Sequence, residues 1–517
     1  MPFHCSPRTL PLAISLALLL GGCSLIPPYL IPTFETGAGY REAVAPAQAQ
    51  LPWKVAAAEA TAQAPWQIFE LPELADLLSR LETANPNLAV SRARYDQAAA
   101  LIDQANAGLF PSLSGNAAVS RARAGGKGTV TTTDSLGLAA SWEIDLWGRV
   151  RATVEANEAS AKASAADLAG VRLALQAQLV QALLSLRVVE IQRQLLDATV
   201  ADYERYVQLT ADRMRFGIAS RADLAQAETQ LRSTEAQAIE TAVQRSQLEH
   251  AIAVLVGELP ANFQLPVRPG VDSTWRAQLR SPGNAVSSQE AVKPGSGTTH
   301  AGIFDLVPAL PTVPLFAAST LLERRPDIAA AERRAAAANA QVGVARAAFF
   351  PVLSLSGAAG QRSTLWSDIL TAPASFWSIG PALAAPLFDA GLRSAQKAQA
   401  VASWEQASAT YRLTVLSAFQ EVEDQLATLR ILADEARVQG EAVKAARVSA
   451  ELTQAQYRAG IASSLQVIVA NGQLLSAERS ALDLHNRRLT AAVVLIRALG
   501  GGWQGAEEVA AANSRNG

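Results

Sequence analysis

The residues able to do chemistry are few and scattered. Beyond residue 22 the histidines are His250, His300 and His485, and no two of them have the spacing of a metal-binding pair. Aspartates and glutamates fall within long helical patterns, where charged side chains ordinarily form a solvated face. Charged residues are 17% of the chain and the formal net charge is −2, without the basic excess of a nucleic-acid-binding protein. We expect no enzyme activity, metal site, cofactor or nucleic-acid partner.

The residue whose context does indicate chemistry is Cys23. An apolar run at 10–20 has the length of a signal-peptide core and is too short to span a bilayer. It ends in LGGC at 20–23, which resembles the bacterial lipobox. The resemblance implies removal of residues 1–22 and acylation of Cys23; the alternative is an ordinary secretory signal followed by a chance cysteine. The only other cysteine, Cys5, lies in the removed segment, so no disulfide is possible.

The elements that must position the rest of the chain occur twice. RFGIAS at 215–220 recurs as RAGIAS at 458–463, with the two glycines 243 residues apart. LFPSLSG at 109–115 recurs as FFPVLSLSG at 349–357 at an offset of 240, measured between the phenylalanines before each proline. Matched landmarks at a nearly constant offset indicate one structural unit used twice.

Each unit predicts a short helix followed by a β-hairpin. Residues 87–108 and 327–348 are alanine-rich and follow a proline, which suits the first position of a helix. Two weakly alternating runs around a polar loop then predict β-hairpins at 112–145 and 352–389. Outside the N-terminus no stretch of about 18 apolar residues occurs, so transmembrane helices are not expected.

A long helical hairpin completes each unit. Uninterrupted helical patterns run over 149–215 and 392–458, and a helix of about 66 residues rises roughly 100 Å. Each is followed by a glycine turn and roughly 40 further helical residues. The returning helix and the short helix together nearly match the long helix in length, which predicts that the two stack end to end along it.

The repeated turn stands at the tip of each helical hairpin. Glycine just after a helix tolerates the left-handed conformation that ends it, and arginine before the turn suits a helix C-terminus. The serine can cap the returning helix, and the residue three positions on completes a capping box. These residues are Arg215, Gly217, Ser220 and Asp223 in the first tip, and Arg458, Gly460, Ser463 and Gln466 in the second.

The remaining segments complete a division of the chain into six regions. Between the units a stretch at 268–305 is rich in Pro, Gly, Ser and Thr and predicts a polar insert in a connecting segment. The regions are a signal peptide (1–22), an N-terminal lipid-anchored segment (23–65), the first repeat (66–258), the connecting segment (259–320), the second repeat (321–500) and a C-terminal tail (501–517).

The strands raise the question of a membrane. Four strands are too few to close a barrel, and open sheet edges are not tolerated in lipid, so several copies would have to contribute. Three chains would supply twelve strands. Trp142, Trp147, Trp366 and Trp377 lie in or beside the hairpins, as interfacial aromatic girdles require. The alternative is a pair of soluble hairpins with core aromatics, and the pattern leaves both open.

In combination these features resemble a known family. The lipobox, LLERRPDI at 321–328, IDLWGR at 144–149 and the paired tips are similar to those of the outer-membrane factors, the TolC-like efflux ducts, in their lipoprotein branch. The resemblance covers nearly the whole mature chain. It implies a mainly α fold with a membrane β-barrel: a homotrimer with a twelve-stranded barrel in the outer membrane and an α-helical barrel across the periplasm.

The resemblance also implies a function and partners. The protein would be the outer-membrane exit duct of a tripartite efflux pump, lipid-anchored in the outer membrane and in contact with its lipids. It would conduct substrates passively after docking its tips onto a periplasmic adaptor, a membrane fusion protein, that couples it to an inner-membrane RND-type transporter. The alternative is a structural coiled-coil lipoprotein without a pore, which leaves the two aromatic-flanked hairpins unexplained. The exported substrate is not readable from the residues.

One departure from the family pattern concerns closure of the duct. In the family, aspartates shortly after the second tip often form a ring that narrows the resting duct and binds cations. Here Gln466 and Val469 occupy those places, and the acid at the matching place of the first tip is Asp223. Asp223 either only completes the capping box with Ser220, or also converges with its copies as a gate. We expect a duct less sensitive to divalent cations than the family pattern suggests.

Overall fold

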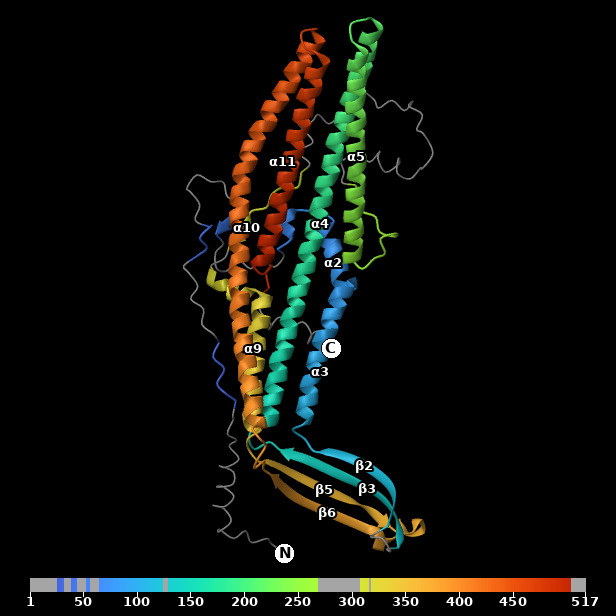
Figure 1. Cartoon of the computed structure of the whole chain (residues 1–517), viewed down its shortest axis with the longest axis vertical. Helices are drawn as coiled ribbons and strands as arrows, with labels where there is room; N and C mark the ends of the chain where they lie inside the picture. The colour runs from blue at the N-terminus through green and yellow to red at the C-terminus, as the bar shows by residue number, and fades with distance from the viewer. Residues whose placement is uncertain are drawn as a thin grey trace.

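The protein is a rod of long helices with a β-sheet at one end (Figure 1). Cys23, the insert at 268–305 and nearly all of the tail lie outside the described residues. The computed structural model describes residues 26–31, 39–43, 53–55, 65–123, 129–267, 307–315 and 318–503.

The two repeats contain the same elements in the same order. The first repeat consists of α2 (Leu74–Ala84), α3 (Pro86–Ala107), β2 (Ser112–Arg123), β3 (Val130–Ile144), α4 (Arg149–Arg215) and α5 (Arg221–Leu255). The second consists of α8 (Leu321–Arg324), α9 (Pro326–Ala347), β5 (Val352–Ser363), β6 (Ser375–Ala384), α10 (Leu392–Arg458) and α11 (Ser464–Ala498). Smaller elements are β1 (Trp53–Val55), β4 (Val313–Leu315) and the 3-10 turns at Gln67–Phe69, Ala318–Thr320, Trp366–Asp368 and Ala372–Ala374.

The element bounds agree closely with the sequence-based expectations. α4 and α10 have 67 residues each and the predicted limits, whereas α5 and α11 have 35 residues rather than roughly 40. The second hairpin ends at Ala384 instead of 389, since Pro386 cannot donate to the ladder. Asp389 then accepts a hydrogen bond from the Gly391 backbone N–H at 3.0 Å, just before α10.

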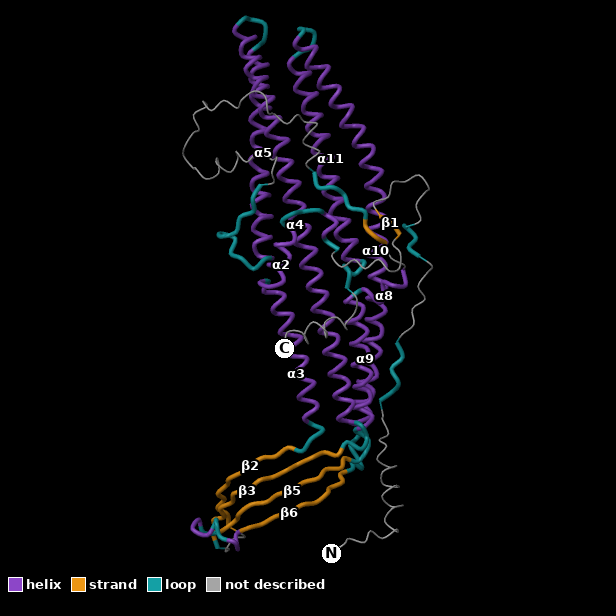
Figure 2. The backbone as a smooth tube through the Cα atoms, turned by 180° about the vertical axis from the view of Figure 1, so that it is seen from behind, coloured by secondary structure: helices purple, strands orange, loops and turns teal. Residues whose placement is uncertain are grey.

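The helices form a single curved layer. Near the sheet the order of neighbours is α3, α4, α9, α10, and in the other half it is α5, α4, α11, α10 (Figures 1 and 2). α4 and α10 run through both halves, while the shorter helices stack end to end beside them. The layer therefore has two edges, one formed by α3 and α5 and the other by α10.

The end-to-end stacking is built in the same way in both repeats. The Asn85 side-chain amide donates to the Leu255 carbonyl at 2.7 Å, and Arg325 donates to the Ala498 carbonyl at 2.9 Å at the matching place. Gly257 and Gly500 close these junctions with φ values of 76° and 92°. A Cβ there would lie 2.2 Å from the Ala84 oxygen and 1.9 Å from the Arg324 oxygen, so only glycine fits.

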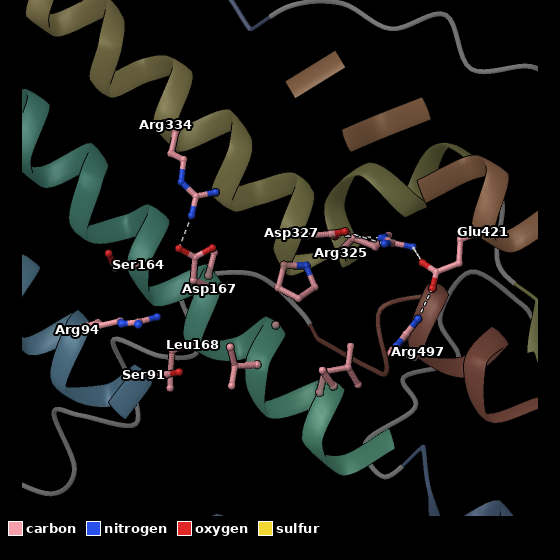
Figure 3. Close-up of a pocket in the computed structure, with 16 residues that line it drawn as sticks. Ser91, Arg94, Ser164, Asp167, Leu168, Arg325, Asp327, Arg334, Glu421 and Arg497 are labelled. Atoms are coloured by element: carbon pink, nitrogen blue, oxygen red, sulfur yellow. Dashed lines mark hydrogen bonds and ion pairs between the residues drawn. The ribbon is translucent and has the colours of Figure 1, made fainter. Parts of the chain in front are cut away.

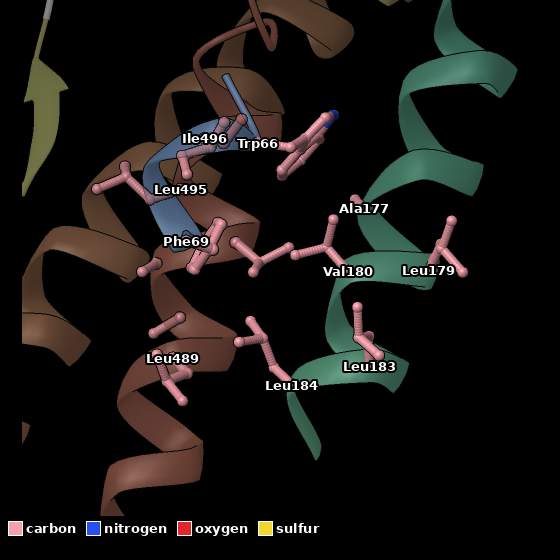
Figure 4. Close-up of a cluster of buried hydrophobic side chains, with 14 of the residues drawn as sticks. Trp66, Phe69, Ala177, Leu179, Val180, Leu183, Leu184, Leu489, Leu495 and Ile496 are labelled. Carbon is pink, nitrogen blue, oxygen red and sulfur yellow. The ribbon is translucent and has the colours of Figure 1, made fainter. Parts of the chain in front are cut away.

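The core lies at mid-height, where α4 meets α11 and the chain entering α2. Trp66 and Phe69 pack against this pair of helices (Figure 4). By length and composition one described helix, α4, could cross a membrane, a criterion that a buried core helix also meets. Its apolar residues Leu179, Val180 and Leu183 are fully buried in this core, which explains their hydrophobicity without a bilayer.

Candidate functional site: two helical tips and a two-faced sheet

Each tip is a glycine-terminated helix end. In the first tip the Ile218 N–H donates to the Arg213 carbonyl at 2.8 Å and the Gly217 N–H donates to the Met214 carbonyl at 3.0 Å. This is the Schellman arrangement, and it requires the left-handed φ of 73° at Gly217. Gly460 repeats it with a φ of 78°. A Cβ would meet nothing within 4 Å at either glycine, so the requirement for glycine there is purely conformational.

Both predicted capping boxes are present. The Ser220 hydroxyl accepts from the Asp223 N–H at 3.1 Å, and the Asp223 carboxylate accepts from the Ser220 N–H at 2.9 Å. Gln466 makes the reciprocal contact with the Ser463 N–H at 2.8 Å. These bonds satisfy backbone donors that a helix start otherwise leaves without partners.

Asp223 has a second role that its sequence neighbours do not reveal. Its other carboxylate oxygen accepts from the Ser464 hydroxyl at 2.7 Å, which links the first tip to the second. The hydrogen bonds from Ser464 and Ser220 hold the pKa of Asp223 below its usual value. Within one protomer the carboxylate is thus engaged by its own chain, which favours the capping interpretation over a free gating acid.

An aromatic pair joins the two hairpins below the tips. The rings of Tyr206 and Tyr457 lie 5.3 Å apart, and burial is the main cause that raises the pKa of Tyr206. Arg213 lies 4.0 Å above the Tyr457 ring and donates to the Tyr457 carbonyl at 3.0 Å. Sequence reasoning missed this contact, because Met214 and not an aromatic residue stands in the first repeat where Tyr457 stands in the second.

The ends of the tips are apolar and exposed. Phe216, Ile218 and Ile461 are 74–80% exposed, and Arg215 makes a surface ion pair with Asp212 at 3.3 Å. Exposed apolar side chains gathered at one place on a surface mark an interaction site.

The sheet has the strand order β2-β3-β5-β6, is antiparallel throughout, and has one apolar face. The register is continuous, so cross-strand partners share a face and alternate residues lie on opposite faces. One face is mainly apolar and carries Leu113, Val119, Leu136, Leu138, Trp142, Ile144, Leu353, Leu355, Trp377, Ile379 and Leu383. Its charged residues, Arg121, Arg123 and Asp134, lie at the end of β2 and β3 away from the helices. Most of these apolar side chains are exposed, so no described element of the same protomer shields this face from solvent.

The opposite face carries mostly polar or small side chains. Its ionisable residues among the described strands are Glu143, near the helices, and Arg362, near the far end of β5. Glu143 is neutralised by Arg149 through two bonds of 2.8 and 2.6 Å. Otherwise serine, alanine and glycine predominate. An apolar outside with a polar inside is the pattern of a transmembrane β-barrel strand set.

The predicted aromatic girdle divides into two parts. Trp366 and Trp377 are more than 70% exposed, as interfacial residues should be. Trp147 instead stacks on Phe350 at 4.8 Å and donates to the Pro351 carbonyl, and Trp142 donates to the Leu109 carbonyl. These two tryptophans fasten the sheet to the helices.

The structure also has a charged cavity of about 600 Å³ where α3, α4 and α9 meet the end of α11 (Figure 3). We call the ionic group on its wall the junction cluster: Arg325, Asp327, Glu421 and Arg497. Arg325 contacts Asp327 at 2.6 Å and Glu421 at 3.0 Å, and Arg497 pairs with Glu421. Because these charges neutralise one another, we interpret the cluster as a contact that holds the helix ends together, and not as the wall of a ligand pocket.

A second buried ionic group, the belt cluster, lies between α4 and α5 and consists of Glu73, Arg187, Glu190, Arg245 and Glu249. Glu190 bridges Arg187 at 2.7 Å and Arg245 at 2.9 Å. The two arginines also donate to the carbonyls of Pro266 and Leu265, where the connecting segment leaves the repeat.

Comparison with known proteins agrees with this architecture. The model of the outer membrane efflux protein family matches residues 77–258 and 317–501, the two repeats. The chain belongs to this family. The family is a channel family, so the protein is an outer-membrane efflux channel and not an enzyme.

Individual relatives cover almost the whole chain. The pyoverdine export outer membrane protein OpmQ of Pseudomonas aeruginosa is 31% identical over 508 residues, 95% of this chain and 96% of that protein. The cation efflux system protein CusC of Escherichia coli O157:H7 is 27% identical over 96% of this chain and 99% of its own length. The solved outer-membrane channel OprN superposes with a TM-score of 0.79 at 28% identity, covering 93% of this chain and 100% of that one.

Proposed function

We propose that three copies of this chain form the outer-membrane exit duct of a tripartite efflux pump. The observation that carries the proposal is that the sheet and the helical layer both end in open edges. Among the described strands, β2 and β6 each lack a partner on one side. Exposed apolar residues follow the edge helices, including Ile239 on α5 and Leu413 and Leu452 on α10. Open strand edges are not tolerated in lipid, and three four-stranded sheets make a twelve-stranded barrel. A poreless coiled-coil lipoprotein would need no such sheet.

Disulfide crosslinking between copies tests this assembly. Cysteines at Leu113 or Val119 on β2, combined with cysteines at Ile379 or Leu383 on β6, should yield covalent trimers on non-reducing gels. A cysteine pair at Leu138 and Leu355 provides the matched control, since β3 and β5 are interior strands. Crosslinks equally frequent in the control, or none between β2 and β6 at any register, would refute the trimeric barrel.

The tips are proposed to dock a periplasmic adaptor that couples the duct to an inner-membrane RND-type transporter. The exposed apolar residues at both tips support this role, together with Arg215, Gly217, Ser220, Arg458, Gly460 and Ser463 around the turns. Single cysteines at Ala219 and Ala462 should crosslink to the adaptor. Crosslinks confined to mid-height positions such as Val438 would show that docking lies elsewhere.

Cys23 is proposed to carry a lipid that anchors the chain in the outer membrane. It lies outside the described residues, but the chain just beyond it runs along α9 near the sheet. The Asn339 amide donates to the Pro27 carbonyl at 2.8 Å, and a Cβ on Gly343 would lie 2.9 Å from the Ile26 side chain. Mass spectrometry of the mature N-terminus should find acylation that Cys23→Ser abolishes. An unmodified wild-type Cys23 would end the proposal.

The resting duct is proposed to respond only weakly to divalent cations. Asp223 is the acid of the first capping box, and its carboxylate accepts hydrogen bonds from Ser220 and Ser464. In the second tip Gln466 occupies the matching position. If copies of Asp223 nevertheless converge, their repulsion would favour cation binding. Planar-bilayer conductance of wild type and Asp223→Asn, with and without divalent cations, separates the cases. Strong cation block that survives the substitution would place a gate elsewhere.

A further inference from the structure

Among the residues that the structure describes, the polar face of the sheet carries one charge that forms no ion pair. Arg362 is the second-last residue of β5, at the end of the sheet away from the helices, and it is exposed. Glu143, the other ionisable residue of this face among the described strands, lies near the helices and is neutralised by Arg149. The net charge of the face is therefore positive, and it is concentrated at the far end.

Arg362 is held in position by an aromatic ring. Its guanidinium carbon lies 4.9 Å from the centre of the Phe376 ring, within the range of a cation–π interaction. Phe376 is paired with Gly360, and Gly360 with Gly137, so two glycines follow it across the sheet. A Cβ on Gly137 would lie only 3.6 Å from the Phe376 ring. The tip of the Phe376 ring therefore reaches Gly137, where no side chain obstructs it, and the Arg362 guanidinium lies over the ring.

We infer that Arg362 forms a cationic ring inside the barrel near its outer mouth and makes the exit favour anionic over cationic solutes. The inference rests on the proposed trimeric duct, in which the apolar face contacts lipid and the polar face lines the pore. Each of three protomers then contributes one guanidinium at the same height, positioned by Phe376. The substrate class favoured at this point is small organic anions.

The size of the barrel makes the field of this ring effective. With strands about 4.8 Å apart and tilted by about 40°, twelve strands form a ring of roughly 12 Å radius. The guanidinium groups project inward from that wall, while the Debye length at physiological salt is about 8 Å. The pore axis therefore lies within about one screening length of all three charges, and solutes cannot pass outside their field.

Cysteine reactivity measures this local potential directly. Ser378→Cys places a thiol on the polar face of β6, two residues from Phe376, and the ratio of its reaction rates with anionic and cationic methanethiosulfonate reagents is measured on whole cells. We expect Arg362→Gln to lower the anion-to-cation ratio by at least about threefold, the effect of three screened charges at this distance, and Arg362→Glu to lower it further. Phe376→Leu should lower the ratio partially, because the guanidinium loses its fixed position.

Matched controls separate failure of the inference from failure of the duct. Arg121→Gln removes an arginine from the opposite face of the sheet and should leave the ratio unchanged. Ala359→Cys, on the apolar face, should react poorly with both charged reagents. Reversed reactivity, with Ala359→Cys reactive and Ser378→Cys protected, would refute the pore and the inference together. If Ser378→Cys reacts but its anion-to-cation ratio does not change when Arg362 is substituted, the proposed duct is retained and the inference alone is refuted.

Discussion

The two repeats share one backbone plan but stabilise it with different chemistry. The belt cluster of the first repeat contains Arg187, Glu190, Arg245 and Glu249, and the matching residues of the second repeat are Arg430, Ala433, Arg488 and Ala492. The junction cluster of the second repeat contains Arg325, Asp327, Glu421 and Arg497, and its counterparts in the first are Asn85, Asn87, Gln178 and Val254. The second repeat thus keeps both arginines of the belt positions but has alanine in place of the two acids, whereas the first repeat has only neutral residues at the junction positions.

The difference follows the segments that do not repeat. The belt cluster binds the carbonyls of Leu265 and Pro266, where the connecting segment leaves the first repeat. At the matching place Arg430 pairs instead with Glu42 of the N-terminal segment at 2.8 Å. At the belt positions, therefore, the arginines of both repeats bind a segment that the other repeat does not have.

The junction cluster accompanies a shorter helix. In the first repeat α2 has 11 residues and buries Leu74, Leu77 and Leu81 before the stacking point. In the second repeat α8 has only 4 residues and buries Leu321. The second repeat therefore buries fewer apolar side chains at the stacking point. There the ion pairs of the junction cluster and the hydrogen bond from Arg325 to the end of α11 hold the stacked helices in place.

The largest effect is expected where the belt cluster is broken. Glu190→Ala leaves Arg187 and Arg245 buried without the acid that bridges them, which should cost about 3–5 kcal/mol in the free energy of unfolding. Glu441→Ala, in a fully surface pair with Arg437, should cost at most about 1 kcal/mol. Denaturant titration of the purified variants measures both. Equal small losses would mean that the cluster is dispensable.

The next effect tests a place where the repeats agree. Gly257→Ala and Gly500→Ala combine a left-handed backbone with a steric clash, and each should cost about 2–4 kcal/mol. Gly217→Ala and Gly460→Ala, which meet no neighbour, should cost only about 1 kcal/mol. The same titration ranks the four variants. Tip variants as damaging as the junction variants would contradict the geometric distinction.

A smaller effect, of opposite sign, is expected at Arg488. Its Nε is buried without a hydrogen-bond partner among the described residues, and burial lowers the pKa of this guanidinium. Arg488→Met should therefore be neutral or stabilising by about 1 kcal/mol, since an apolar residue removes an uncompensated polar group. Arg245→Met, at the matching place, should destabilise. A clear loss of stability from Arg488→Met would indicate a partner in the assembled trimer.

The smallest effect concerns the pH dependence of the tips. Because the pKa of Asp223 is depressed in the folded state, its link to Ser464 is complete above the unfolded value of about 3.9 and is lost as pH falls through the folded pKa. Hydrogen exchange corrected for intrinsic rates should show loosening at Ser464 only below about pH 4, and none in Asp223→Asn. Gln466→Glu should add a second acid-sensitive tip. Loosening near neutral pH would contradict this assignment.

Local signals were sufficient to predict the helices and their ends. The glycine after each long helix and the serine before each returning helix affect only the backbone within a few residues. The limits of α4 and α10 could therefore be predicted from the sequence, and the structure has them as expected. The capping boxes at Ser220 and Ser463 follow from the same short range. The length of the returning helices was overestimated, because their ends depend on the junctions with Ala84 and Arg324.

Contacts between distant parts of the chain could not be predicted in this way. Ser464 meets Asp223 across 241 residues, and Arg213 meets Tyr457 across 244. The duplication did not help, because neither pair has a counterpart at the matching positions. Likewise Trp142 and Trp147 looked like interfacial residues, and only the junction of sheet and helices shows that they are fastened there.

The duplication, the lengths of the long helices and the places where they turn follow from the amino-acid sequence without any tertiary contact, because these depend on local propensity and on spacing along the chain. Tertiary structure alone decided which edges stay open, which face of the sheet carries Arg362, and which of two equivalent sites receives an ionic cluster. Those properties depend on register and on neighbours far away in sequence, and a shift of one residue in register would exchange the two faces of the sheet.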